Sequence, residues 1–125
     1  NSNGLDDRQK RNVELSLKEF NRIEKLDTDF VVRRSKAVSN TYHAWMDARK
    51  ENDFKVYKKA LGELTEIKRE EADLIGFENH PYDALLDEFE PGMTVEKLDK
   101  LFLDVRSQLV EFVKKLKNYK GIYIN

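Results

Sequence analysis

Four long stretches of the chain repeat apolar residues every three or four positions, and this repeat constrains the fold more than any other feature of the sequence. The spacing places the apolar side chains on one face of an α-helix. Turn-forming residues are scarce, with only five Gly and two Pro among 125 residues. We therefore predict long helices at about residues 6–25, 29–50 and 54–75, and a fourth that begins after Thr94.

Polar residues and glycines between these stretches mark where the helices begin and end. Short side chains that bear oxygen can cap the exposed backbone amides of a first helical turn. Gly76 is expected to end the third helix in a left-handed conformation, and Asn118 or Gly121 to end the fourth. The expected N-cap residues are found among Asp27, Thr28 and Asp29, at Asn52 or Asp53, and at Thr94.

The second stretch contains the pattern of a helix–helix seam. Its apolar or small residues alternate by four and three positions, as coiled-coil seams do, and Tyr42 and Trp45 are expected to be core aromatics. Helices of about 22 residues are ~33 Å long, and their stripes can face one another most simply as antiparallel hairpins. The predicted seam residues are Val31, Ser35, Val38, Tyr42, Trp45 and Ala48 on the second helix, and Phe54, Tyr57, Leu61, Leu64, Ile67 and Leu74 on the third.

The fold class that follows is all-α, with four long antiparallel helices and one short helix near residues 81–89. We expect residues 1–125 to form a single helical domain.

The chain begins Asn-Ser-Asn-Gly without an initiator Met, so we expect it to be processed or to be a fragment of a longer protein. No apolar run approaches the ~20 residues needed to cross a bilayer, and the chain contains no Cys. A cytoplasmic protein with no membrane partner is expected.

Charge is unevenly distributed along the chain. Residues 70–96 contain nine acidic residues and no Lys or Arg, whereas the remainder has 23 basic and 15 acidic residues. The simplest interpretation is that the two parts face each other in the fold. Basic residues alternate with acidic ones and form no stripe, so no nucleic-acid partner is expected. We interpret the pairs Arg33-Arg34 and Lys114-Lys115 and the run 68–71 as solvated surface.

The stretch HPYDALLDEFEPGMT, residues 80–94, contains the one group of side chains with metal-binding chemistry at helical spacing. His80, Asp83 and Asp87 are three and four residues apart and therefore share a helix face, where they can hold a cation. Alternatively, they cap a short helix. Pro81 suits the first helical position, so that His80 is the N-cap and Asp83 is the third residue, which can accept the N-cap amide. We favour capping over a place in a substrate cleft, and either over an autonomous metal site.

No catalytic motif is present. A zincin needs two His one turn apart with a Glu after the first, so that both imidazoles face the ion. The chain has only His43 and His80, and neither is followed by Glu. His43 is expected to be a packing or partly exposed residue. We predict no catalytic and no metal-ligating residue in this chain.

A longer stretch has a recognisable order of residues. KREEADLIGFENHPYDALLDEFEPGMT, preceded by AWMDARKENDF, closely resembles the N-terminal region of the carboxypeptidase Taq family of metallocarboxypeptidases. The resemblance covers residues 6–116, including the lengths between the helices. It implies a large, nearly all-α enzyme with a deep groove, in which one zinc or cobalt ion is held by an HExxH helix and a downstream Glu. Such enzymes remove single residues from peptide C-termini, and family members are commonly dimeric.

The chain departs from the family pattern because it has no HExxH helix. The resemblance therefore implies the N-terminal helical part of a zinc-dependent carboxypeptidase, acting as lid, scaffold or dimer contact and inert alone. Its expected partners are the remainder of the parent peptidase, the peptide substrate and a second copy in a homodimer. The alternative is a free-standing helical protein–protein interaction module. The resemblance leaves His80, Tyr82, Asp83 and Asp87 as candidates for lining the groove.

Overall fold

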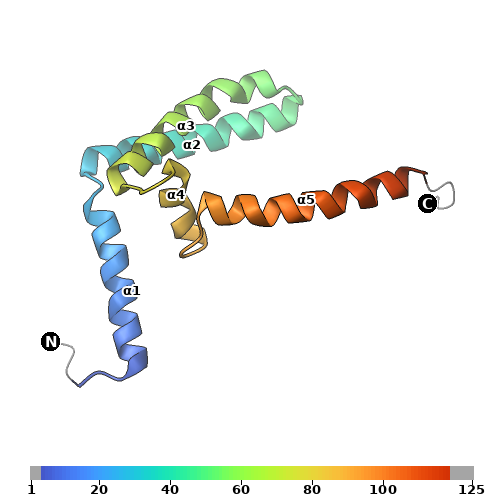
Figure 1. The fold of residues 1–125 in the computed structure, drawn as a ribbon. Helices are drawn as coiled ribbons and strands as arrows, with labels where there is room; N and C mark the ends of the chain where they lie inside the picture. Colours follow the sequence, from blue (N-terminus) through green and yellow to red (C-terminus); the bar gives the residue numbers. More distant parts are fainter. Residues whose placement is uncertain (1–3, 119–125) are drawn as a thin grey trace. The chain divides into compact units, whose positions relative to one another are not determined.

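The computed structural model describes residues 4–118 as five α-helices, with no strand in that range (Figure 1). The predicted all-α fold of four long helices and one short helix near residues 81–89 is confirmed. The suggestion that the last helix ends at Gly121 falls outside the described residues. The helices are α1 (Asp7–Glu24), α2 (Thr28–Glu51), α3 (Phe54–Ile75), α4 (Pro81–Phe89) and α5 (Val95–Asn118).

The chain divides into two compact units. The first is Asn1–Pro81, with helices α1, α2 and α3, and the second is Tyr82–Asn125, with α5 and all of α4 but its first residue. Each unit is described by itself below. That the whole chain forms a single domain stays a prediction.

Short polar residues set the helix boundaries of the first unit. Asp6 caps α1 through a capping box with the third helical residue. Asp27 and Asp53 cap α2 and α3, because each carboxylate accepts a hydrogen bond from a backbone amide of the first turn, at 2.7 and 2.9 Å. Asn52 ends α2 in the left-handed region, with φ 53°. Gly76 ends α3 as predicted with a positive φ of 85°, although its ψ of 150° is extended and not left-handed helical.

Helices α2 and α3 form an antiparallel hairpin and lie side by side (Figure 1). The α2 residues in this interface are spaced alternately four and three apart, as expected of a seam. Most of them are small, which lets the two backbones approach closely. These buried or half-buried residues are Phe30, Arg34, Ala37, Thr41, Ala44 and Ala48 on α2, facing Tyr57, Ala60, Leu61, Leu64, Ile67, Lys68, Glu71, Ala72 and Ile75 on α3.

The predicted α2 seam is therefore wrong by one position at every residue except Ala48, which is buried as predicted. A shift of one residue rotates a helical stripe by about 100°, so the larger apolar residues face away from α3. Tyr42 is 57% exposed and Trp45 46% exposed, and the expectation that both are core aromatics is also wrong. Bulky side chains in the seam would hold the helices apart, whereas the stripe of small residues does not. Of the residues expected on α3, Phe54 and Leu74 are likewise exposed.

Thr41 shows how close the hairpin is. Its side chain is buried, and its hydroxyl lies 2.7 Å from the Ala37 carbonyl within α2 and 3.2 Å from the Ala60 carbonyl of α3. A hydroxyl on such a short side chain reaches a carbonyl of the neighbouring helix only where the two backbones are near each other. The hydroxyl therefore joins the helices without leaving a buried polar group unsatisfied.

A buried carboxylate near the N-terminal end of α2 adds a second link. Glu71 of α3 is fully buried, with 0% exposure, and it forms ion pairs with Arg34 of α2 and, at 2.6 Å, with Lys68 of its own helix. Beside it, Arg33 forms a two-pronged pair with Glu70 at 2.6 and 2.8 Å. The interpretation of these charges as solvated surface is wrong for Glu71, because its register places it in the seam.

The pKa of Glu71 follows from two opposing effects. Burial raises the pKa of this carboxyl, since desolvation disfavours its charged form. The hydrogen bonds and charges of Lys68 and Arg34 favour the charged form more strongly, so the pKa lies below its ordinary value of 4.5. The ionised carboxylate is therefore the folded-state species at neutral pH, and both cations are bound to it.

The first prediction separates the observed seam from the predicted one. Phe30→Ala should lower the free energy of unfolding by about 3–5 kcal/mol, because the fully buried ring leaves a cavity. Trp45→Ala should lower it by about 1 kcal/mol or less, because the indole is half-exposed on the other stripe. Urea unfolding followed by circular dichroism measures both variants. A larger loss for the Trp45 variant would contradict the observed register.

The second prediction concerns Glu71. Glu71→Gln should destabilise the fold by about 1–3 kcal/mol at pH 7, since it removes the counter-charge of Arg34 and Lys68. The carboxyl pKa is lower in the folded than in the unfolded chain, so on acidification the unfolded chain binds the proton first. The advantage of wild type over the variant should persist above pH 4.5 and disappear as the pH falls further.

Glu66→Gln provides a matched control for this experiment. Glu66 pairs with Arg69 at 2.7 Å on the same helix, but both side chains are about 70% exposed. An exposed pair of this kind contributes about 0.5 kcal/mol or less. Equal effects of the two substitutions in urea unfolding, or a Glu71 effect that does not change with acid, would refute the role given to the buried carboxylate.

Candidate functional site

The second unit contains most of the residues that the sequence singles out, at the corner between α4 and α5. Helix α4 begins at Pro81 as predicted, and Ala84 is its buried residue. The chain turns after Phe89, and Thr94 caps α5, with its hydroxyl oxygen 3.3 Å from the amide of Lys97. The corner is built from hydrogen bonds between side chains and backbone.

Asp83 connects the two helices of this corner. Its Oδ1 accepts a hydrogen bond of 2.7 Å from the backbone amide of Val95, the first residue of α5. That amide has no partner within its own helix, and a carboxylate at a helix N-terminus also opposes the positive end of the helix dipole. The sequence assigns Asp83 to the start of α4, whereas this bond serves the start of α5.

Asp87 organises the turn itself. Its Oδ1 accepts a hydrogen bond of 2.9 Å from the amide of Gly92, whose φ of 81° suits glycine and few other residues. Lys97 closes the turn from the other side, because its Nζ donates to the Gly92 carbonyl at 2.6 Å. Neither the Lys97 contact nor the Asp83–Val95 bond is evident from local helical spacing. Pro91-Gly92 followed by Thr94 indicates a turn, but not which side chains hold it.

His80 and Tyr82 lie at the start of α4. His80 directly precedes the helix and is exposed, and Tyr82 in its first turn is 52% exposed. The corner therefore gives Asp83 and Asp87 structural roles as hydrogen-bond acceptors for backbone amides. That these four residues line a substrate groove stays a prediction.

The described residues do not fit a metal centre. Between residues 4 and 118, no group of three or more His, Cys, Asp or Glu side chains could hold a metal ion. His43, the other histidine, lies on exposed α2 surface and has its ring against Tyr42, with 5.9 Å between ring centroids. Within the same range, no helix is both long enough and apolar enough to span a membrane.

Comparison with known proteins relates this arrangement to a family. The sequence profile described as Carboxypeptidase Taq (M32) metallopeptidase matches residues 1–121. Carboxypeptidase 1 of Bacillus subtilis is 35% identical over 116 residues, which cover 90% of this chain and 22% of that protein. Thermostable carboxypeptidase 1 of Pyrococcus furiosus is 28% identical over 88 residues, which cover 70% of this chain and 18% of that protein.

Two solved structures are similar as well. One, called "The Structure of CHT", superposes with a TM-score of 0.90 at 36% identity and covers 97% of this chain and 24% of its own. The other, called "BsuCP Crystal Structure", gives a TM-score of 0.83 at 34% identity, with 90% and 23% coverage. The chain spans about a quarter or less of the length of these relatives. It belongs to the carboxypeptidase Taq (M32) metallopeptidase family.

Proposed function

We propose that this chain is the N-terminal helical part of a metallocarboxypeptidase that removes single residues from peptide C-termini, and that it acts there as lid or scaffold. The match to the family profile over residues 1–121 supports this proposal. The described residues include no metal-holding group, so the zinc or cobalt ligands and the general base would come from other parts of the polypeptide. The chain alone would then be inert.

The construction of the helices suits such a supporting role. The α2–α3 hairpin is joined along its length by small residues, by Thr41 and by the Glu71 ion pairs. A helix of 24 residues, such as α2, extends ~36 Å, enough to cover a large part of a groove. Outside the hairpin, α1 has no buried residue, and large apolar side chains of α5 are exposed. These surfaces are available to the remainder of an enzyme.

In the complete enzyme the partners would be the rest of the polypeptide, the peptide substrate and a second copy in a homodimer. The alternative function is a free-standing interaction module whose exposed apolar faces bind another chain. The exposed stripes of α1 and α5 also favour this alternative. Light scattering over a concentration series tests this alternative, because a clean monomer would argue against an obligate seam partner.

The third prediction tests whether the chain carries a metal site of its own. Zinc titrated into the isolated chain by calorimetry should give no tight 1:1 binding, because residues 4–118 contain no group of three or more His, Cys, Asp or Glu side chains that could hold a metal ion. His80→Ala should leave the weak binding curve unchanged. Tight stoichiometric binding that His80→Ala abolishes would contradict the assignment of all metal ligands to other parts of the enzyme.

The fourth prediction tests the role in the enzyme. In a chimera, this chain replaces the 116-residue region of Bacillus subtilis carboxypeptidase 1 to which it aligns at 35% identity. The chimera should bind metal and release C-terminal residues from a peptide, whereas the same enzyme without the region should not. The isolated chain should show no activity in the same assay. A deletion variant as active as the chimera would remove the proposed lid or scaffold role.

A further inference from the structure

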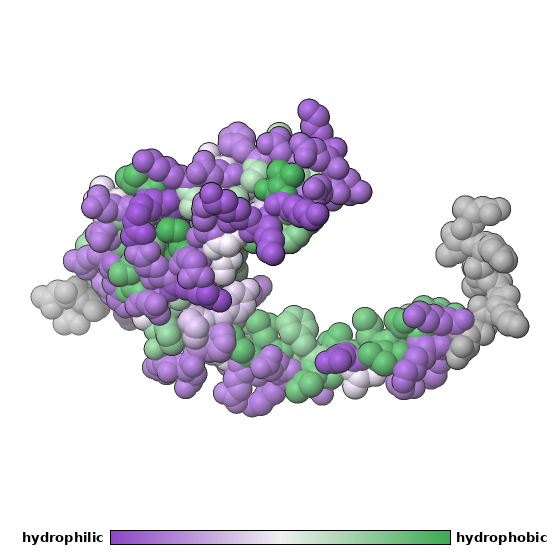
Figure 2. Space-filling model, turned by 90° about the horizontal axis from the view of Figure 1, so that it is seen from above, coloured by the Kyte–Doolittle hydropathy of each residue, from purple (hydrophilic) through white to green (hydrophobic). Residues whose placement is uncertain are grey.

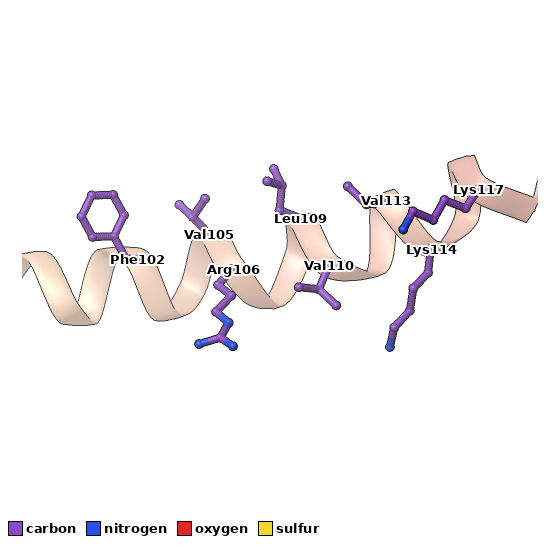
Figure 3. Close-up of a pocket in the computed structure, with 8 residues that line it drawn as sticks. All are labelled: Phe102, Val105, Arg106, Leu109, Val110, Val113, Lys114 and Lys117. Atoms are coloured by element: carbon purple, nitrogen blue, oxygen red, sulfur yellow. The ribbon is translucent and has the colours of Figure 1, made fainter. Parts of the chain in front are cut away.

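Helix α5 has an apolar face whose large side chains are exposed. Leu109 is 57% exposed and Phe102 59% exposed, in the middle and first half of the helix. Figure 3 shows Phe102, Val105, Leu109 and Val113 projecting on one side of the helix, with Val110 on the other side in this view, between Arg106 and Lys114. The space-filling view shows apolar surface along α5 (Figure 2).

This face is wider than a single seam requires. Leu101, Phe102 and Leu103 are consecutive and all more than half exposed. Consecutive residues are about 100° apart around a helix, so these three alone extend over about half of the circumference. A helix at the surface of a globular protein has an apolar stripe of ~100°. The α5 face therefore has room for a packed neighbour in addition to any shared with its own unit.

The charges beside this face all have one sign. Arg106, Lys114 and Lys117 line a hollow on this face together with apolar residues, and no carboxylate among residues 4–118 lines this hollow. Lys114 forms an ion pair with Glu111 at 3.4 Å, on the polar side of the helix. A neighbour that covers the apolar face would place its own flanking residues against these cations, so acidic flanks give attraction and basic flanks repulsion.

These charges disfavour two possible partners for the apolar face, a second copy of the chain and a membrane. If a second copy of α5 packed on the same face, six cations would border one seam. An anionic membrane surface attracts helices whose polar face is strongly basic, but α5 also contains Glu96, Asp104 and Glu111, and Glu96 holds Lys100 at 2.7 Å. The mixed charge on the polar side suits water, whereas the cations at the edge of the apolar face suit an acidic protein neighbour.

We propose that the α5 face from Phe102 to Val113 is the packing surface for an amphipathic helix with acidic flanking residues. This proposal rests on the proposed function, because the helix would belong to the part of the peptidase that lies beyond this chain. Leu109 would be buried at the centre of the contact. Arg106 and Lys117 would each face a carboxylate at its edge.

Two labelled peptides test the charge preference in trans. Each is a 21-residue amphipathic helix with Leu at the two seam positions of every heptad, and the flanking positions are all Glu in one and all Lys in the other. Fluorescence anisotropy with the 125-residue chain should show the Glu peptide binding on the order of tenfold more tightly at low salt. Added salt should reduce this preference. Arg106→Glu combined with Lys117→Glu should remove or invert it.

Leu109→Asp should abolish binding of the Glu peptide, because it places a carboxylate in the apolar contact. Ser107→Asp adds the same charge on the opposite side of α5 and should leave binding unchanged. Circular dichroism checks that both variants keep the wild-type helix content. Equal binding of the two peptides, or equal effects of the two Asp variants, would overturn the proposal.

The rival occupants have their own measurements. Self-association in light scattering that Leu109→Asp removes would assign the face to a second copy and overturn the proposal. Cosedimentation with phosphatidylserine vesicles that depends on Leu109 would assign the face to a membrane and would also overturn the proposal.

In the Bacillus subtilis chimera, Leu109→Asp should lower the melting temperature by several degrees and Ser107→Asp should not. An inactive chimera would count against the proposed function, whereas the peptide comparison tests the α5 surface without catalysis.

Discussion

The close approach of α2 and α3 along small side chains is the constraint on which the rest of the first unit depends. Because Ala37, Thr41 and Ala48 occupy little space, the Thr41 hydroxyl reaches a carbonyl of α3, and Arg34 reaches Glu71. The same approach excludes the bulky stripe of α2 from the hairpin. The aromatic residues on that stripe are exposed as a consequence. A helix that packs against its partner along one stripe turns the neighbouring stripe away from that partner.

Helix number, type and limits were predictable from the sequence, because caps and breakers act locally. Gly76 and Thr94 mark ends that depend on only a few neighbouring residues. The seam was not predictable in the same way. Two stripes on α2 share the spacing of four and three, and only the partner helix decides between them. Arg34 and Glu71 do lie in heptad register with the small residues, but a charged pair in a seam resembles surface charge when each helix is considered alone.

The candidate site shows the same limit at shorter range. His80, Asp83 and Asp87 are three and four residues apart in the sequence, but this spacing does not identify their partners, and His80 lies before the first residue of α4. Asp83 accepts a hydrogen bond from Val95, twelve residues away, and Asp87 accepts one from Gly92 across the turn. Oxygens bound to backbone amides in this way fix a corner, and such bonds use acceptor capacity that a metal ligand would need. The type of a residue therefore indicates its role only once the group that it binds is known.

The acidic segment 70–96 is divided between the two units of the chain, and its carboxylates have two kinds of partner. Glu70 and Glu71 do pair with Arg33 and Arg34 across the hairpin, as the simplest interpretation predicts. Asp83 and Asp87, however, use backbone amides as their partners. Of the cations that line the α5 hollow, Arg106 and Lys117 have no ion pair within residues 4–118. The segment therefore contributes carboxylates both to ion pairs across the hairpin and to the hydrogen bonds that fix the α4–α5 corner.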